Sequence, residues 1–202
     1  MKDNNSKQVL LSVLGVAILV VAVVGVSFAA FSYSKTGAKV NTITTGTITM
    51  SYSETTNGIN LVDALPMKDE IGKALSDENQ YFDFTVSADV TGTTTIDYAI
   101  TASKEEDSTI PDTGVKVYLS NMDEGADTEI LAPTKVSELT ATAGGEASGA
   151  PEGHFKLKTG TISSTGSHAY RLRMWVADDY SNLGSSGTYK IRVNVYGAAK
   201  AQ

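Results

Sequence analysis

Apolar and polar residues alternate with a period of two through most of the chain after Phe31, and this alternation limits the possible fold more than any other feature. From Phe82 to Val90 every second residue is apolar, and polar residues such as Asp83 and Thr85 fill the positions between them. Such a period is that of a β-strand with one face on a core and the other in solvent. The same alternation is present in Gly46–Tyr52, Thr94–Ala102, Val115–Leu119, His168–Val176 and Tyr189–Val195.

Several short strands separated by Gly, Ser and Asn predict an all-β protein, an antiparallel two-sheet sandwich of jelly-roll or Greek-key type. Thr91-Gly92-Thr93 predicts a hairpin turn between the strands on either side of it. Met67–Leu75 alone has a short helical pattern. Residues 137–153 are rich in Ala, Gly, Ser and Thr, so we expect a long flexible loop there.

The N-terminal segment predicts a hydrophobic signal helix. Val9–Phe31 contains no charged residue and follows a short polar stretch with two lysines. A run of about 20 apolar residues can span a bilayer, whereas a secretory signal is usually shorter and ends in small residues. Ser27 and Ala29 stand where a signal peptidase needs small side chains, which predicts cleavage before Ala30. Two alternatives stay open: the segment is retained as a membrane anchor, or the chain is a type IV pilin, which the absence of an acidic residue in the run disfavours.

These patterns divide the chain into a signal peptide (1–29, or an anchor if it is retained), an extended arm (30–39) and a sandwich domain (40–202). The chain has no cysteine, so the sandwich must rely on packing alone. Its net charge of -7 argues against a nucleic-acid partner and against adhesion to anionic lipid. We therefore expect contact with a membrane only through the N-terminal segment before cleavage, and a location outside the cell or on its surface.

The stretch "AAFSYSKTGAKVNTITTGTITM" resembles the start of the mature region in the TasA and camelysin family. The likeness continues at Leu61–Leu75, at Tyr170–Asn182 and in the last strand, "GTYKIRVNVYGAAKAQ". The positions of the first stretch that match the family pattern are Phe31, Ser32, Asn41, Thr45, Gly46 and Thr47.

The resemblance implies a jelly-roll sandwich that is processed by a signal peptidase of the SipW type. It also implies assembly into extracellular fibres of a biofilm matrix, in which the N-terminal segment of one subunit adds as a strand to the next. The expected partners are then further copies of the same chain, joined head-to-tail, and a matrix or assembly helper protein.

The arm has the pattern that such a donor strand needs. Phe31 and Tyr33 alternate with Ser32 and Ser34, as pocket-filling residues of an added strand would. An unpaired sheet edge offers free N–H and C=O groups to such a strand, and a contact between two different surfaces can propagate without closing. The alternatives are that this stretch is a disordered tail or pairs within its own subunit.

The sequence contains only weak candidates for catalytic or metal-binding motifs. Camelysin-like relatives are described as metalloproteases, but a zinc protease of that kind needs H-E-x-x-H, and the two histidines, His154 and His168, do not form it. Asn121–Glu129 is acidic but lacks the spacing of an EF-hand, so we interpret it as a solvated turn. Asp178 and Asp179 have the same interpretation. We therefore expect no enzyme activity, no metal site and no cofactor.

Trp175, the only tryptophan, lies on the same strand face as Arg171 and Arg173. It is a candidate surface aromatic for binding a partner. The alternatives are that a loop covers it or that its face is the inner one.

The favoured function is thus an exported fibre subunit. The alternatives are a membrane-anchored monomeric surface domain that binds a protein or glycan, and a secreted metalloprotease.

Overall fold

A computed structural model describes residues 32–36, 41–45, 48–56, 59, 64–91, 94–181 and 187–200, and up to residue 49 it gives the backbone path alone. The elements in chain order are β1 (Ser32–Thr36), β2 (Asn41–Thr45), β3 (Ile48–Glu54), α2 (Asp69–Lys73), β4 (Tyr81–Val90), β5 (Thr95–Lys104), η1 (Asp112–Gly114), β6 (Val115–Asn121), η2 (Asp123–Gly125), β7 (Thr128–Lys135), η3 (Val136–Glu138), β8 (Phe155–Ile162), β9 (Gly166–Val176) and β10 (Ile191–Lys200).

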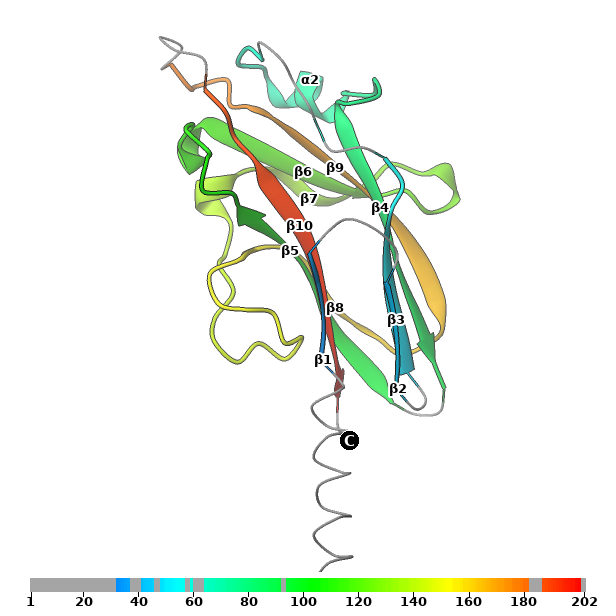
Figure 1. Ribbon diagram of the computed structural model, residues 1–202. Helices are drawn as coiled ribbons and strands as arrows, with labels where there is room; N and C mark the ends of the chain where they lie inside the picture. The colour runs from blue at the N-terminus through cyan, green and yellow to red at the C-terminus, as the bar shows by residue number, and fades with distance from the viewer. Residues whose placement is uncertain are drawn as a thin grey trace, which may run out of the picture.

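The strands form two sheets that face each other (Figure 1). One is four-stranded with the order β1-β10-β5-β8, and the other is six-stranded with the order β2-β3-β4-β9-β6-β7. Neighbouring strands in both sheets are antiparallel. The predicted all-β sandwich is therefore confirmed.

The core lies between the sheets and is built from the alternating residues that the sequence places on one face. Phe84 and Val86 of β4 and Leu172 of β9 are almost fully buried, and they meet Ile100 and Val195 from the opposite sheet. The rings of Phe82, Phe84 and Tyr170 stack in a row with centroids 5.7 and 5.4 Å apart. These contacts confirm the expected inner faces of β4, β5, β6, β9 and β10.

The predicted hairpin between β4 and β5 is wrong. β4 pairs with β3 and β9 in the six-stranded sheet, whereas β5 pairs with β10 and β8 in the four-stranded sheet. The connection therefore crosses from one sheet to the other, and residues 92–93 of the expected turn lie outside the described residues. Alternation shows which face of a strand is buried, but both sheets present an inner face, so it does not show which sheet the strand joins.

Short segments cover part of both outer faces. On the six-stranded sheet, α2 lies within the predicted helical stretch and packs with Met67 and Leu75 over Tyr118 and Trp175. On the four-stranded sheet, Ala150 packs on Ala99 and Tyr196.

The long loop expected at 137–153 is present, and part of it packs on the four-stranded sheet. Thr142, Ser148 and Ala150 are buried, and the amide of Gly153 donates to the carbonyl of Thr142 at 3.0 Å. Small residues suit this close packing.

Candidate functional site

The most prominent site is a groove between the two sheets, and its first wall is the edge of β10. β1 pairs with β10 from Ser32 opposite Ala198 to Thr36 opposite Asn194. β10 itself begins at Ile191, so residues 191–193 extend beyond the last partner in β1. Among the described strands, none pairs with this side of residues 191–193. This stretch of the edge therefore has backbone groups available to a further strand.

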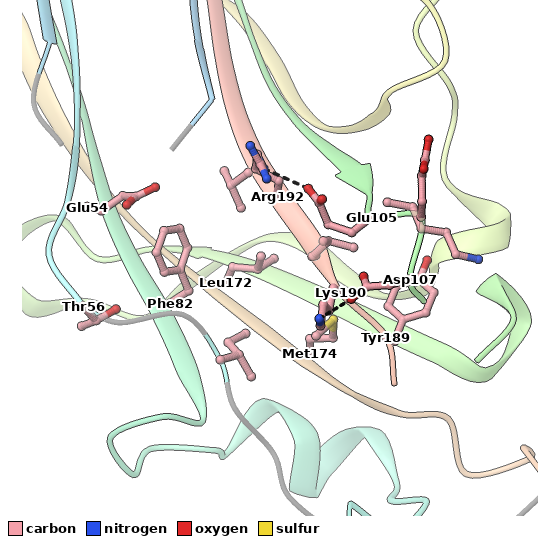
Figure 2. A pocket seen from close by; sticks show the side chains of 15 residues that line it. Glu54, Thr56, Phe82, Glu105, Asp107, Leu172, Met174, Tyr189, Lys190 and Arg192 are labelled. Atoms are coloured by element: carbon pink, nitrogen blue, oxygen red, sulfur yellow. Dashed lines mark hydrogen bonds and ion pairs between the residues drawn. The ribbon is translucent and has the colours of Figure 1, made fainter. Parts of the chain in front are cut away.

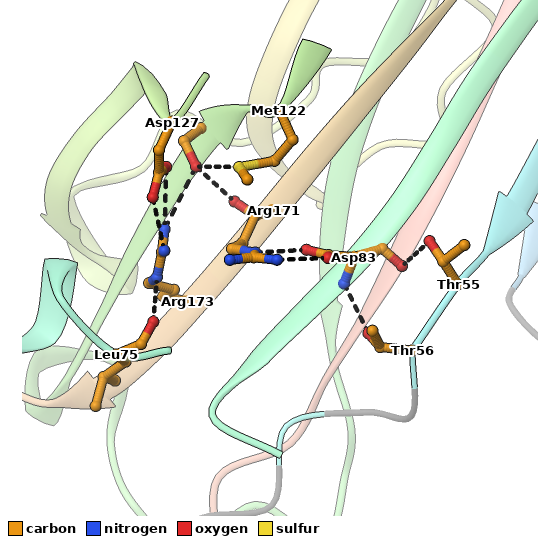
Figure 3. Close-up of polar contacts among 9 residues, drawn as sticks. Thr55, Thr56, Leu75, Asp83, Met122, Asp127, Arg171 and Arg173 are labelled. Atoms are coloured by element: carbon orange, nitrogen blue, oxygen red, sulfur yellow. Dashed lines mark hydrogen bonds and ion pairs between the residues drawn. The ribbon is translucent and has the colours of Figure 1, made fainter. Parts of the chain in front are cut away.

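The second wall is the end of β3. β2 pairs with β3 only as far as Tyr52, which is opposite Asn41, so Glu54 extends beyond the hairpin. The chain after β3 stays attached to β4, because the amide of Thr55 donates to the carbonyl of Asp83 at 3.0 Å. In Figure 3 the hydroxyl of Thr55 donates to the same carbonyl at 3.1 Å, and the hydroxyl of Thr56 accepts from the amide of Asp83 at 2.8 Å. This attachment fixes the position of Glu54 across the groove from β10.

The groove has a volume of about 930 Å³ and opens between these two walls (Figure 2). Phe82 of β4 and Leu172 of β9 line it from one sheet, and Ile191 and Val193 line it from the other. The remaining apolar lining residues are Ile59, Met174 and Tyr189. An apolar groove beside an unpaired strand edge is the arrangement that binds an extended peptide by β-augmentation.

Charged residues surround the opening, and most are already paired. Arg192 binds Glu105 at 2.9 Å, Lys104 binds Asp112 at 2.7 Å, and Lys190 binds Asp107. Two lining carboxylates, Glu54 and Glu106, have no ion-pair partner among the described residues, although Glu54 accepts a hydrogen bond from the hydroxyl of Tyr52 at 3.2 Å. The groove therefore has acidic side chains available at its mouth.

The opposite side of the sandwich is protected from strand addition. Its edge strands are β7 and β8. β7 contains Pro133, which has no N–H to donate, and its pairing with β6 has two irregularities. β8 carries Lys156 and Lys158, which discourage edge-to-edge pairing. The two sides of the molecule therefore differ in their ability to accept a strand.

The candidate donor residues Ser32, Tyr33 and Ser34 lie in β1 of their own chain, where they pair with β10. This is the placement expected if the arm pairs within its own subunit, and donation to a neighbour stays a prediction. Ser27, Ala29, Ala30 and Phe31 lie outside the described residues. The described part of the chain contains no helix with the length and apolar character needed to cross a membrane.

Trp175 is not a surface aromatic. Its side chain is 1% exposed, because α2 lies over it on the outer face of the six-stranded sheet. A Cβ atom at Gly72 of α2 would lie 2.3 Å from the indole ring, so glycine is what allows the helix to sit this close. The indole N–H is buried without a hydrogen-bond partner among the described residues.

The acidic turn is exposed from residue 124 to residue 129, as the sequence predicted, and two of its carboxylates also bind neighbouring segments. Asp127 binds Arg173 at 2.7 Å, and Arg173 is buried and also donates to the carbonyl of Leu75 (Figure 3). Asp123 accepts from the ring of His168 at 2.7 Å. Partial burial works against ionisation of Asp123, but the hydrogen bonds from His168, Ala169 and Asn121 outweigh it and lower its pKa. The turn therefore binds β9 and, through Arg173, stabilises the segment after α2.

The remaining metal candidates are engaged in ion pairs. Asp178 binds Lys116 at 3.2 Å, and Asp179 binds Lys135 at 2.6 Å. Within the described residues, no group of three or more His, Asp or Glu side chains is close enough to hold a metal ion.

His154 lies where the 139–154 loop meets the four-stranded sheet. Its Nδ1 atom is 3.2 Å from the hydroxyl of Thr101 and 3.5 Å from that of Tyr196. Its carbonyl accepts from the amide of Thr142 at 2.7 Å. Burial lowers the pKa of His154 below 6.5. In the same loop Glu146 pairs with Lys156 of β8, and among the described residues no carboxylate bonds to the imidazole.

We expect the loop to loosen in mild acid. Because the pKa of His154 is lower in the folded protein, the unfolded chain takes up a proton first as the pH falls through 6.5. The stabilising effect of neutral His154 is complete above that pH and is lost below it. Hydrogen-exchange protection of the Thr142 and Gly153 amides should fall between about pH 7 and pH 5. His154→Gln should remove this pH dependence, and His168→Gln should retain it; equal pH dependence in wild type and His154→Gln would contradict the assignment.

No protein-family model matches this chain, and no curated protein or solved structure matches it either. The function of the groove is therefore inferred from its geometry. No sequence motif singles out the groove residues, although Glu54 gives a signal. It follows Met50 and Tyr52 on the inner face of β3 and places a charge where the alternation would place an apolar residue.

Proposed function

We propose that this chain is an exported structural subunit that assembles head-to-tail into extracellular surface or biofilm-matrix fibres. In this proposal the N-terminal arm of one processed subunit adds as a strand to β10 of the next. The observation that supports it most is the combination of an incompletely paired β10 edge with the open apolar groove beside it.

The strand order supports a jelly roll, the fold expected for such subunits. The order β1-β10-β5-β8 faces β4-β9-β6-β7, and the β2–β3 hairpin extends the second sheet. In this order β1, the first described strand, is the neighbour of the last strand, β10, and lies on the edge of its sheet. An edge strand can be replaced by the same strand from another copy without rearrangement of the core.

Within one subunit, β1 pairs with only part of β10. β1 covers five residues, whereas β10 has ten. After Thr36 the chain must cross to β2, which belongs to the other sheet, within four residues. The arm of a neighbouring copy does not need to reach β2 of the subunit that receives it. It can therefore continue along β10 over the groove and bury apolar surface that the single subunit leaves accessible.

The test is electron microscopy of the protein that is secreted from its native host, combined with N-terminal sequencing. The proposal predicts a start at Ala30 and fibres that contain the chain as their main component. Single particles of a protein with that start would contradict the fibre assignment, and a chain that still begins at Met1 would favour the anchored monomeric domain. A structural subunit should also lack zinc-dependent proteolytic activity on casein, which tests the metalloprotease alternative.

A further inference from the structure

We infer that Glu54 recognises a lysine of the arriving arm and thereby fixes the register of the added strand. This inference rests on the proposed function, because it concerns how the groove selects the arm of a second copy. It names the pair Lys39 of one copy and Glu54 of the next.

The register of β1 on β10 gives the position of Lys39. In the single chain Lys35 is opposite Val195 and Thr36 is opposite Asn194. If a neighbour's arm keeps this antiparallel register and continues along β10, residue 37 falls opposite Val193 and residue 39 opposite Ile191. Residues opposite each other in an antiparallel pair share a face of the sheet. Lys39 would therefore lie on the groove side, as Ile191 does.

Glu54 lies on the far wall of the same groove. Tyr52 and Met50, two and four residues before it, are buried in the core, so the alternation of β3 directs Glu54 to the inner side as well. Figure 2 shows its side chain across the opening from Arg192. Facing sheets lie about 10 Å apart, a gap that a lysine and a glutamate side chain span together.

Charge also favours this occupant. The arm from Ala30 to Lys39 contains Lys35 and Lys39 and no acidic residue. The basic side chains that line the groove are already paired with Glu105, Asp107 and Asp112, whereas Glu54 and Glu106 have no cationic partner among the described residues. An inserted lysine would neutralise a carboxylate that has no ion pair with any described residue of its own subunit.

Register selection follows from the position of this pair. A shift of the arm by one residue would turn Lys39 away from the groove and place Ala38 or Val40 opposite Ile191. The pair also requires the arm to extend along β10 as far as residue 39. β2 of the donor begins only two residues later, at Asn41. The two sandwiches are then in direct contact rather than joined by a long linker.

Charge reversal in the processed full-length chain tests the pair. Lys39→Glu alone and Glu54→Lys alone should each raise the critical concentration for fibre formation about tenfold, equivalent to about 1.4 kcal/mol per contact. In each single variant like charges meet in the groove. An equimolar mixture of the two variants should assemble close to the wild-type concentration, because alternating copies then present opposite charges at every contact. Glu152→Lys, an exposed reversal in the 139–154 loop, should leave the critical concentration unchanged.

The double variant Lys39→Glu with Glu54→Lys should also recover assembly. Failure of both the mixture and the double variant to recover, or wild-type assembly of each single variant, would overturn the pairing. A chain that lacks residues 30–39 tests arm donation separately from the Lys39–Glu54 pair. If the truncated chain forms fibres, arm donation itself is wrong; if it does not while the single variants assemble normally, only the Lys39–Glu54 pair is wrong.

Discussion

A processed chain that begins at Val40 instead of Ala30 is expected to remain monomeric at concentrations where the wild-type chain forms fibres. The truncation removes β1, which lies on the edge of the four-stranded sheet, and the described buried core lies on other strands. The sandwich should therefore still fold while the contact between subunits is lost. Sedimentation and electron microscopy over a hundredfold range of concentration measure the effect.

A peptide of residues 30–39 provides the matched control. It should bind the truncated chain and raise its unfolding temperature, because a ligand that binds the folded state alone stabilises it. A peptide with the same residues in scrambled order should not. Lys35→Pro in the complete processed chain offers a second variant. The carbonyl of Lys190 bonds on the β5 side, so the backbone of Val195 faces β1, and proline opposite it removes an N–H that β1 donates to β10 and should prevent assembly without truncation. Fibres from the truncated chain, or from Lys35→Pro at the wild-type concentration, would contradict strand donation.

Gly72→Ala should lower the free energy of unfolding by about 3 kcal/mol, the upper end of what overpacking usually costs. The added methyl would lie 2.3 Å from two carbons of the Trp175 ring, so α2 must lift or the ring must turn. Alanine is the better helix former by about 1 kcal/mol, so helix propensity alone would predict the opposite sign. Denaturation followed by the fluorescence of Trp175, the only tryptophan, reports stability and the environment of the ring together.

Gly166→Ala is the comparison for this variant. A Cβ atom at Gly166 would meet nothing within 4 Å, and this glycine does not have a positive φ angle. Its substitution should change stability little or increase it. If Gly72→Ala behaved in the same way, α2 would not lie against Trp175 in solution.

The strands with strict alternation could be predicted from the sequence almost to the residue. Tyr81–Val90 is β4 as expected, and β9 differs from the predicted stretch only at its start. β8 gave no such signal, because Leu157 is its only fully buried residue and lysines and threonines fill most other positions. The pattern depends on one buried and one exposed face, and β8, at the edge of its sheet, has too few buried residues to show it.

Contacts that join distant parts of the chain could not be predicted. The sequence places Trp175 on one strand face with Arg171 and Arg173 but does not show what covers that face, because the helix over it comes from a separate segment. The acidic turn has the composition of an exposed loop, yet the partners of Asp123 and Asp127 lie on β9. Periodicity is a local property and does not show which segments meet.

The groove depends on where neighbouring strands end. β1 stops pairing at Thr36, and β2 stops pairing at Asn41 opposite Tyr52. The ends of these two pairings leave β10 and Glu54 accessible on one side of the sandwich. The boundaries of strands are the least predictable feature of a sequence, so the groove could not be located in advance.

The most direct test of strand donation uses the absence of cysteine in the chain. Ser32 and Ala198 are opposite each other in the β1–β10 pair, at a separation that suits a disulfide. The processed single variants Ser32→Cys and Ala198→Cys are mixed, allowed to assemble and oxidised. Strand donation predicts disulfide-linked dimers that contain one chain of each variant, formed in fibres and not in the monomeric fraction. Fibres that yield no such mixed dimer would show that each arm stays on its own β10, and would contradict the account.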